Sequence, residues 1–401
     1  MREFKVPASE ILARRKKIQQ EMLDREIGGI FISQRVDLFY FTGTAQNGYL
    51  YMPAEGEPLL CIKKYLPRAK KESPLKQILE IDSLKEIPGL ITDYYGRLPR
   101  TMGLEFDVLP VKHFHFYRTL FPVREFVDAS PHILKARMIK SAWEIEQMEK
   151  TAALSRDTFA YAKETIRSGF TELEFAGLME TFARRRGHGA QLRIRDYRAE
   201  GFPWHILSGI SGGIVGLLDS PASGEGTSAA FPCGAGNKLL QADEPIMIDF
   251  GTVMNGYHID ETRFFAIGSM PERARKACLA ATEIHNRILE MARPGTPLSD
   301  LFQFSLDLAK TLGYADQYLG PMGNKVAFVA HGIGLELVEP PFLAEGRHDL
   351  LEAGMTLALE PKMVFEGEFS AGIESVFVVT EKEGRLLSKT PAEIFIVDRK
   401  S

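Results

Sequence analysis

The stretch IDFGTVMNGYHIDETRFF, residues 248–265, decides the fold that the sequence predicts. Two apolar runs flank Asn255-Gly256, and this dipeptide is the strongest short signal for a two-residue hairpin turn. Each run also holds an aspartate, Asp249 in the first and Asp260 in the second. Side chains alternate along a strand, so both aspartates share one face of the hairpin, about 7–8 Å apart at the backbone. The stretch therefore predicts two carboxylates that converge in apolar surroundings.

A second hairpin is expected where MTLALEPKMVF and AGIESVFVVT flank Glu366-Gly367-Glu368. Gly367 lies seven residues from both Glu360 and Glu374, so a tight turn there sets these two glutamates opposite each other. Pro361 indicates a bulge or an edge at this point, because proline donates no ladder hydrogen bond. Between the two hairpins, FVAHGIGLELVEPP carries His331 from an apolar run into a glycine-containing turn.

Two aspartates, two glutamates and one histidine form an oxygen-rich set of potential metal ligands. Four carboxylates held close together in apolar surroundings repel one another, which raises their pKa values, and bound divalent cations remove that cost. The set suits manganese, cobalt, iron or zinc. A pair of such ions, about 3.5–4 Å apart, can activate a water and hold a carbonyl oxygen. The five residues therefore predict a metal-dependent hydrolytic site.

The N-terminal part of the chain predicts a separate mixed α/β domain. Helical spacing of apolar residues covers residues 9–26, and IFISQ, NGYLYMP and LLCIKK are typical of strands. A capping box that begins at Ser141 predicts the start of a long helix. We expect a domain over residues 1–135 and a second domain over residues 136–401.

The second domain contains a weak internal repeat. Residues 168–187 and 294–313 each open with a turn that contains glycine, continue as an amphipathic helix and close on glycine. Each unit follows a longer expected helix, over about 141–167 and 271–292, and each precedes a hairpin that carries two carboxylates. Two helices and a hairpin, twice over, predict a domain with approximate twofold symmetry.

The composition is that of an ordinary globular protein. A net charge of −4 over 401 residues argues against nucleic acid or an anionic membrane as the main partner. The three cysteines stand far apart, which suits a reducing compartment without disulfides. No apolar run reaches the length of a membrane span. We therefore expect a cytoplasmic protein.

These motifs resemble one family. The segments around the five potential ligands are similar to those of metallopeptidases with the pita-bread fold, which include aminopeptidase P, prolidase and methionine aminopeptidase. The segments DLFYFTGTAQNGYLYMP and KARMIKSAWEIEQMEK resemble the creatinase-like N-terminal domain of the aminopeptidase P and prolidase branch. The similarity extends over nearly the whole chain. It implies an α+β protein, in which a mixed α/β N-terminal domain precedes a pita-bread domain with a curved antiparallel sheet and outer helices.

The resemblance also implies site residues, a cofactor and an activity. The implied ligands of two divalent ions, with manganese or cobalt ahead of zinc or iron, are Asp249, Asp260, His331, Glu360 and Glu374. Asp260 and Glu374 would bridge both ions, and Glu360 would relay the proton of the attacking water. The implied reaction is hydrolysis of the bond between an N-terminal residue and proline in a short peptide, by a homodimer.

Several positions depart from the family pattern. Val338 stands where a histidine is common, Lys362 where a glycine commonly follows Glu-Pro, and Ser375 where an aspartate is common. The loop before the first hairpin also lacks the histidine that family members usually carry there. His205, as a proton donor or pocket wall, and His258, as a substrate contact, are the available substitutes, although either can equally be a structural histidine.

These departures leave alternative functions open. The main expectation is an Xaa-Pro aminopeptidase or dipeptidase with Glu360 and His205 as catalytic residues and His205 and His258 as substrate contacts. A metal-dependent hydrolase or lyase of a small non-peptide substrate would use the same ligands with a different pocket. A non-catalytic binding protein of this fold is the third alternative, although such a protein typically loses metal ligands, and this chain retains all five.

Overall fold

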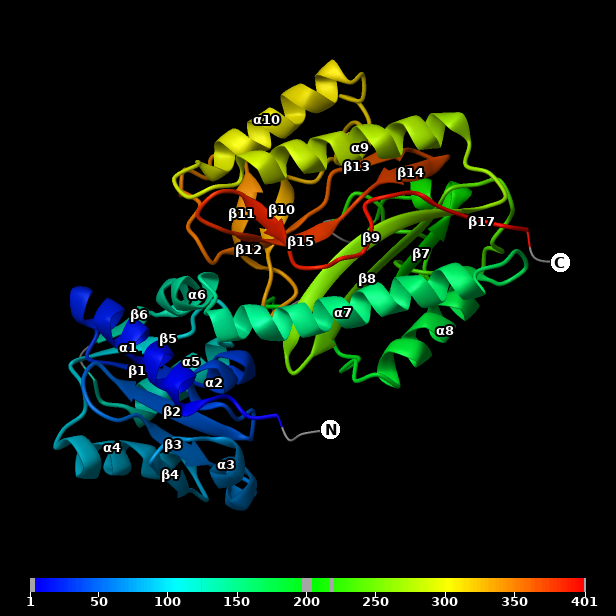
Figure 1. Ribbon diagram of the computed structural model, residues 1–401. Helices are drawn as coiled ribbons and strands as arrows, with labels where there is room; N and C mark the ends of the chain where they lie inside the picture. Colours follow the sequence, from blue (N-terminus) through cyan, green and yellow to red (C-terminus); the bar gives the residue numbers. More distant parts are fainter. Residues whose placement is uncertain (1–3, 124, 197–203, 217–219, 400–401) are drawn as a thin grey trace. The chain divides into compact units, whose positions relative to one another are not determined.

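The structure is a computed structural model that describes residues 4–123, 125–196, 204–216 and 220–399 (Figure 1). It divides into two compact units. One comprises Met1–Arg137 with Arg195–Arg198, and the other comprises Met138–Ile194 with Ala199–Ser401. The two units are described separately below.

The N-terminal unit is built on one six-stranded mixed sheet in the order β4-β3-β2-β1-β5-β6. Its helices are α1 (Ala8–Asp24), α2 (Arg35–Thr42), α3 (Leu66–Glu72), α4 (Ile87–Tyr95), α5 (Val111–Leu120) and α6 (Ser130–Met138). Its strands are β1 (Gly29–Ile32), β2 (Gly48–Pro53), β3 (Leu59–Ile62), β4 (Gln77–Glu80), β5 (Thr101–Leu104) and β6 (Glu125–Asp128). The helix and the three strands expected from the sequence are therefore present, in a mixed α/β unit.

The C-terminal unit repeats a simple order of elements. Its helices are α7 (Ala142–Thr165), α8 (Glu172–Arg184), α9 (Glu272–Met291) and α10 (Leu298–Thr311). Its strands are β7 (His205–Ser208), β8 (Ile246–Met254), β9 (Tyr257–Ile267), β10 (Phe328–Gly332), β11 (Glu339–Ala344), β12 (Thr356–Leu359), β13 (Lys362–Phe365), β14 (Phe369–Gly372), β15 (Ser375–Val379), β16 (Gly384–Leu386) and β17 (Phe395–Val397). Helices α7 and α8 precede the hairpin β8–β9, and helices α9 and α10 precede the strands β10 to β16.

The helices pack outside the strands in both halves. Helix α7 packs on β8 and β9, whereas α9 packs on β13 and β14 (Figure 1). Glycines at matching positions of the repeat, Gly169 with Gly295 and Gly187 with Gly313, all have positive φ, between 86° and 107°. These conformations favour glycine because it lacks a Cβ. The expected architecture of outer helices around antiparallel strands is confirmed.

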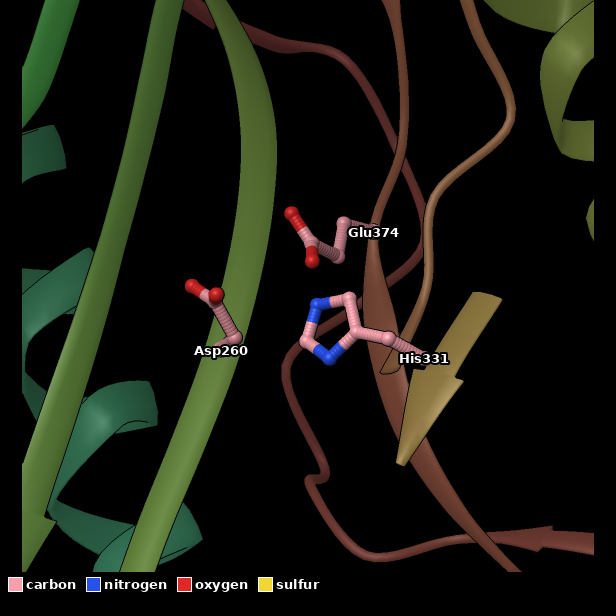
Figure 2. A group of neighbouring side chains, drawn as sticks. All are labelled: Asp260, His331 and Glu374. Carbon is pink, nitrogen blue, oxygen red and sulfur yellow. The ribbon is translucent and has the colours of Figure 1, made fainter. Parts of the chain in front are cut away.

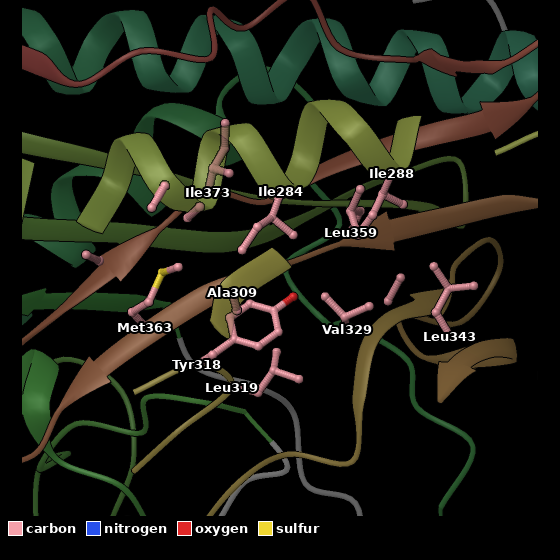
Figure 3. Packing of buried hydrophobic residues seen from close by; sticks show 14 of the residues in the cluster. Ile284, Ile288, Ala309, Tyr318, Leu319, Val329, Leu343, Leu359, Met363 and Ile373 are labelled. Atoms are coloured by element: carbon pink, nitrogen blue, oxygen red, sulfur yellow. The ribbon is translucent and has the colours of Figure 1, made fainter. Parts of the chain in front are cut away.

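Each half has its own hydrophobic core. Side chains of α7, α8, β8 and β9 form one buried cluster, in which Phe159 and Trp204 pack against Phe250. Figure 3 shows the other, where Ile284 and Ile288 of α9 meet residues from the opposing strands, among them Val329 and Leu359. Each core packs helices against strands that carry carboxylates, and so the two cores support the two hairpins.

The register of the first hairpin is the one that a turn at Asn255-Gly256 imposes. Asp249 lies opposite Thr262, and Asp260 lies opposite Gly251. Asn255 and Gly256 have φ values of 56° and 88°, as a type I′ turn requires. The two aspartates are therefore diagonal neighbours on one face of β8 and β9.

The second hairpin keeps one register along two separate strand pairs. Lys362 pairs with Gly372 in β13–β14, and Leu359 pairs with Ser375 in β12–β15. Glu360 and Glu374 occupy the break between these pairs, where Pro361 interrupts the ladder. The break gives both glutamates a place opposite each other, as the spacing around Gly367 predicts.

The Gly256 turn provides a test of this fold. Gly256→Ala should lower the free energy of unfolding by about 1–2 kcal/mol, because an added Cβ is strained at positive φ. The measurement is chemical denaturation followed by tryptophan fluorescence. Gly177→Ala is the matched control, since Gly177 lies in α8 with open space around it and an added Cβ should leave stability unchanged or raise it. Equal stabilities for the two variants would contradict the turn assignment.

Candidate metal centre

A cleft in the C-terminal unit brings the sequence-predicted ligands together. Its lining includes Asp249, Asp260, His331, Glu360 and Glu374, together with His205 and Lys362. The other lining residues are largely apolar. Most of these ionisable side chains are buried, so their charges lie in surroundings of low dielectric constant.

Five chain segments deliver the five side chains. Asp249 and Asp260 come from the facing strands β8 and β9, and His331 lies near the end of β10. Glu360 follows β12 directly, and Glu374 precedes β15. The hairpin β8–β9 and the segment before β15 are joined at Thr262 and Glu374, whose backbone N–H groups donate to each other's carbonyl oxygens at 3.3 and 3.2 Å. That pairing brings the two carboxylate-bearing hairpins to one place.

Asp260, His331 and Glu374 point toward one another (Figure 2). Each offers one ligand atom, and these three atoms all lie within 4.8 Å of one another. Two carboxylates and one imidazole are a donor set that manganese, iron, cobalt and zinc accept. Within the described residues, this is the group of His, Cys, Asp and Glu side chains that is arranged to hold an ion.

Hydrogen bonds orient two of these ligands. The Nδ1 atom of His331 lies 3.0 Å from the carbonyl oxygen of Gly332 and must donate to it, which leaves Nε2 with its lone pair. Burial lowers the pKa of His331, so the ring is neutral, as a metal ligand must be. The hydroxyl of Thr262 donates to Glu374 Oε2 at 2.8 Å. Such supporting bonds hold the ligands in position before an ion arrives.

Lys362 contacts three of the four carboxylates in the cleft. Its Nζ atom donates to Asp249 Oδ2 at 3.0 Å, to Glu360 Oε2 at 3.0 Å and to Glu374 Oε2 at 2.9 Å. Burial alone would lower the pKa of the Lys362 amine. The three carboxylates together have the larger, opposite effect, so this pKa stands well above its usual value. Lys362 therefore carries a positive charge inside the cleft.

The ammonium group does not neutralise the whole cluster. Burial, followed by the charges of Glu374 and Asp249, raises the pKa of Asp260 well above its usual value. Burial also raises the pKa of Glu360 to about 8, although Lys362 opposes the shift. Burial alone would raise the pKa of Asp249, but the charges and hydrogen bonds of Lys362 and His205 together lower it below its usual value. A further cation fits beside Asp260, together with His331 and Glu374.

His205 lies on β7 directly opposite Asp249. Its Nδ1 atom is 3.8 Å from Asp249 Oδ2, and its buried Nε2 atom has no hydrogen-bond partner among the described residues. A buried ring nitrogen without a partner is costly unless a ligand or water bonds to it. The cleft therefore offers His205 Nε2 as a group that can bond to a substrate.

His258 has a different environment from the one expected for a substrate contact. Its Nε2 atom accepts from the backbone N–H of Arg193 at 3.1 Å, and its Nδ1 atom donates to the carbonyl oxygen of Gly334 at 3.0 Å. Both ring nitrogens are thus occupied by the backbone, and His258 is not part of the cleft lining. This geometry fixes two neighbouring segments to β9 and gives no support to a substrate contact at His258.

The sequence did not predict that Lys362 lies among the carboxylates of the cleft. In the sequence, Lys362 was only a departure from the family pattern. Glu360 and Lys362 are two residues apart, the spacing that places side chains on one face of an extended chain. That spacing is a signal that could have found it. Pro361 stands between them, and a break in the strand at a proline can place the two side chains on different faces.

The buried ring of His258 gives a prediction about pH. Burial lowers the pKa of His258 to about 4, whereas the unfolded chain protonates near 6.5. The stabilisation from the neutral ring is therefore complete above pH 6.5 and is lost as the pH falls toward 4. The difference in unfolding free energy between the wild type and His258→Gln should shrink by about 1.5 kcal/mol from pH 6.5 to pH 5, because the unfolded histidine takes up its proton over this range and the folded one does not. Denaturant titrations at several pH values measure it, and a constant difference would contradict the assignment.

Comparison with known families adds independent information. The sequence model of the Creatinase/Prolidase N-terminal domain matches residues 14–139, and that of Metallopeptidase family M24 matches residues 146–381. Within the described residues, no helix is long and apolar enough to cross a membrane.

Named relatives match along nearly their whole length. The chain is 26% identical to the Xaa-Pro dipeptidase of Pyrococcus furiosus, over 95% of this chain and 99% of the relative. It is 24% identical to the Xaa-Pro dipeptidase of Lactobacillus helveticus, over 95% of this chain and 98% of the relative.

Solved structures share the fold. The Xaa-Pro dipeptidase of Bacillus anthracis superimposes with a TM-score of 0.82 at 22% identity, covering 96% of this chain and 100% of that one. The X-Pro aminopeptidase of Thermotoga maritima gives a TM-score of 0.79 at 24% identity, covering 96% and 99%. The family match extends over more than half of the sequence and includes the segments that build the cleft. The chain therefore belongs to metallopeptidase family M24 and carries the creatinase/prolidase type of N-terminal domain.

Proposed function

We propose that this protein is a metal-dependent peptidase that hydrolyses Xaa-Pro bonds in short peptides. The observation that carries the proposal is the meeting of Asp260, His331 and Glu374 beside Glu360 in one buried cleft of a chain from family M24. The relatives named Xaa-Pro dipeptidase, which match over nearly their full length, support proline peptides as the substrate class.

The donor set fits a divalent ion at Asp260, His331 and Glu374, and we propose manganese or cobalt ahead of zinc or iron. When bound, such an ion supplies Lewis acidity, which polarises a carbonyl and makes a water nucleophilic near neutral pH. The expectation of two ions stays a prediction, since Lys362 contacts the carboxylate of Asp249 that a second ion would need.

The protein's own residues supply proton transfer and orientation. Burial raises the pKa of Glu360 to about 8, so its carboxyl group can gain and lose a proton near neutral pH. A general acid and base works best when its pKa lies near the working pH. We propose that Glu360 accepts the proton of the attacking water and returns it to the leaving amine. His205 Nε2, which has no partner among the described residues, is proposed to bond to the substrate.

One observation favours a second candidate, a hydrolase or lyase of a small non-peptide substrate. Val338 lies in the cleft lining, where the family commonly places a histidine. A valine cannot donate the hydrogen bond by which such a histidine would stabilise a developing oxyanion, an effect of a few kcal/mol. The cleft thus keeps the ligands and has fewer polar groups for a peptide carbonyl.

We also propose that the protein works as a homodimer in the cytoplasm. The three cysteines are free thiols, two of them buried, which suits a reducing compartment. The dimer is proposed from the resemblance to the aminopeptidase P and prolidase branch, and sedimentation equilibrium of the purified chain tests it.

The activity test is a panel of Xaa-Pro dipeptides and tripeptides, with added Mn²⁺ or Co²⁺. The wild type should release the N-terminal residue, and Asp260→Asn should lower kcat/KM at least about 10²-fold, because it removes a charged ligand of the ion that stabilises the transition state. Asp316→Asn is the matched control, an exposed aspartate in the segment after α10, and it should behave as the wild type. Bound metal without turnover of any Xaa-Pro peptide would contradict the proposal. Faster turnover of a non-peptide ester, amide or thioether would favour the second candidate.

A further inference from the structure

The most unusual group in the cleft is the ammonium of Lys362. A protonated lysine has three N–H donors, and here each has a carboxylate acceptor at 2.9 to 3.0 Å, on Asp249, Glu360 and Glu374. The side chain is 1% exposed. All three partners are among the five residues that the sequence predicts as ligands of two divalent ions. The ammonium therefore occupies space that two cations would otherwise share.

The backbone around Lys362 is fixed and gives its side chain a path to the cleft. Lys362 opens β13, where its carbonyl oxygen accepts from the N–H of Leu319 at 2.8 Å. It pairs across the hairpin with Gly372. A Cβ at Gly372 would lie 2.8 Å from Lys362 Cγ, closer than real side chains approach. Because Gly372 has no side chain, there is room beside it for the stem of Lys362, whose ammonium reaches the carboxylates.

The five predicted ligands form two sets that overlap at Glu374: the three carboxylates that contact the ammonium, and the three residues that can hold one ion. Asp260, His331 and Glu374 converge within 4.8 Å and form a site for one ion. Asp249 lies outside that group, and its Oδ2 atom bonds to Lys362 and faces His205 Nδ1 at 3.8 Å. The residue on which a second ion depends is therefore already paired with a cation that belongs to the protein.

We propose that Lys362 replaces the second divalent cation, so that this chain holds one exchangeable metal ion, at Asp260, His331 and Glu374, beside a fixed ammonium group. The inference rests on the metal centre of the proposed function and is independent of the substrate. A covalently attached charge cannot dissociate, so chelation removes one ion and leaves Asp249 neutralised by Lys362. A divalent ion at the same place would instead require the buried lysine to leave all three of its carboxylate partners.

Manganese binding tests the proposal directly. Free Mn²⁺ is counted by electron paramagnetic resonance during titration of the metal-free protein, which gives the number of ions bound per chain. The wild type should bind one ion and show the spectrum of isolated Mn²⁺. Lys362→Ala should bind two ions, with the spin coupling that two manganese ions show when carboxylates bridge them.

Lys140→Ala is the matched control. Lys140 is also a buried lysine, paired with Glu339 at 2.8 Å, and it is not part of the cleft lining. Its removal should leave the number of bound ions at one. Circular dichroism and thermal melting of both variants establish that each is folded before its metal content is compared with that of the wild type.

Three results would overturn the proposal. Two ions, or none, on the wild-type chain would contradict a one-ion centre, and this measurement stands even if Lys362→Ala fails to fold. A folded Lys362→Ala chain that still binds one ion would show that the lysine is not what replaces the second. Peptide hydrolysis is scored separately: one ion on a chain that cleaves no Xaa-Pro peptide would overturn the proposed function and leave this inference standing.

Discussion

Mutual repulsion among four carboxylates, three of them buried, is the constraint on which the rest of this structure depends. Charges in a cleft of low dielectric constant interact far more strongly than in water, so the cluster needs positive charge to remain ionised. The chain provides part of that charge itself, through Lys362, and the rest is left to a bound cation. Accordingly, the pKa of Asp249, which contacts Lys362, is lowered, whereas the pKa of Asp260 is raised.

The fold serves to hold these charges together against their repulsion. Two sets of outer helices bury the backs of two hairpins, and the Thr262–Glu374 pairing joins the hairpins at the cleft. Arg263 strengthens this joint, because its guanidinium donates to the backbone carbonyl of Glu374 at 2.6 Å. The same architecture in relatives at 22 to 24% identity shows that the frame tolerates extensive sequence change. Within this frame, Val338 and Lys362 line the cleft and contribute to its chemistry.

Local signals in the sequence were sufficient to predict the two hairpins and the meeting of their four carboxylates in one cleft. The Asn255-Gly256 turn fixed the register of the first hairpin, and the spacing of Glu360 and Glu374 about Gly367 predicted the second, because turn position and strand alternation are local properties. The resemblance to a known family then added the fold of the whole chain. Helix starts such as the capping box at Ser141 were also predictable, since a cap depends on residues three positions apart.

Features that depend on distant segments were not predictable in this way. Lys362 reaches the carboxylates because Gly372, on the neighbouring strand, leaves room for its stem. His258 shares a strand face with Asp260, yet backbone groups near residues 193 and 334 hold its ring outside the cleft. Neither relation is visible in a single stretch of sequence, because each arises when loops and strands far apart in the chain are packed together.

The central claim is that Asp260, His331 and Glu374 hold a divalent cation. Anomalous X-ray diffraction from crystals of the wild type grown with Mn²⁺, collected at the manganese absorption edge, tests it most directly. The account predicts a peak bonded to a carboxylate oxygen of Asp260, to His331 Nε2 and to a carboxylate oxygen of Glu374. A manganese peak elsewhere in the chain, with these three side chains turned away from one another, would contradict it.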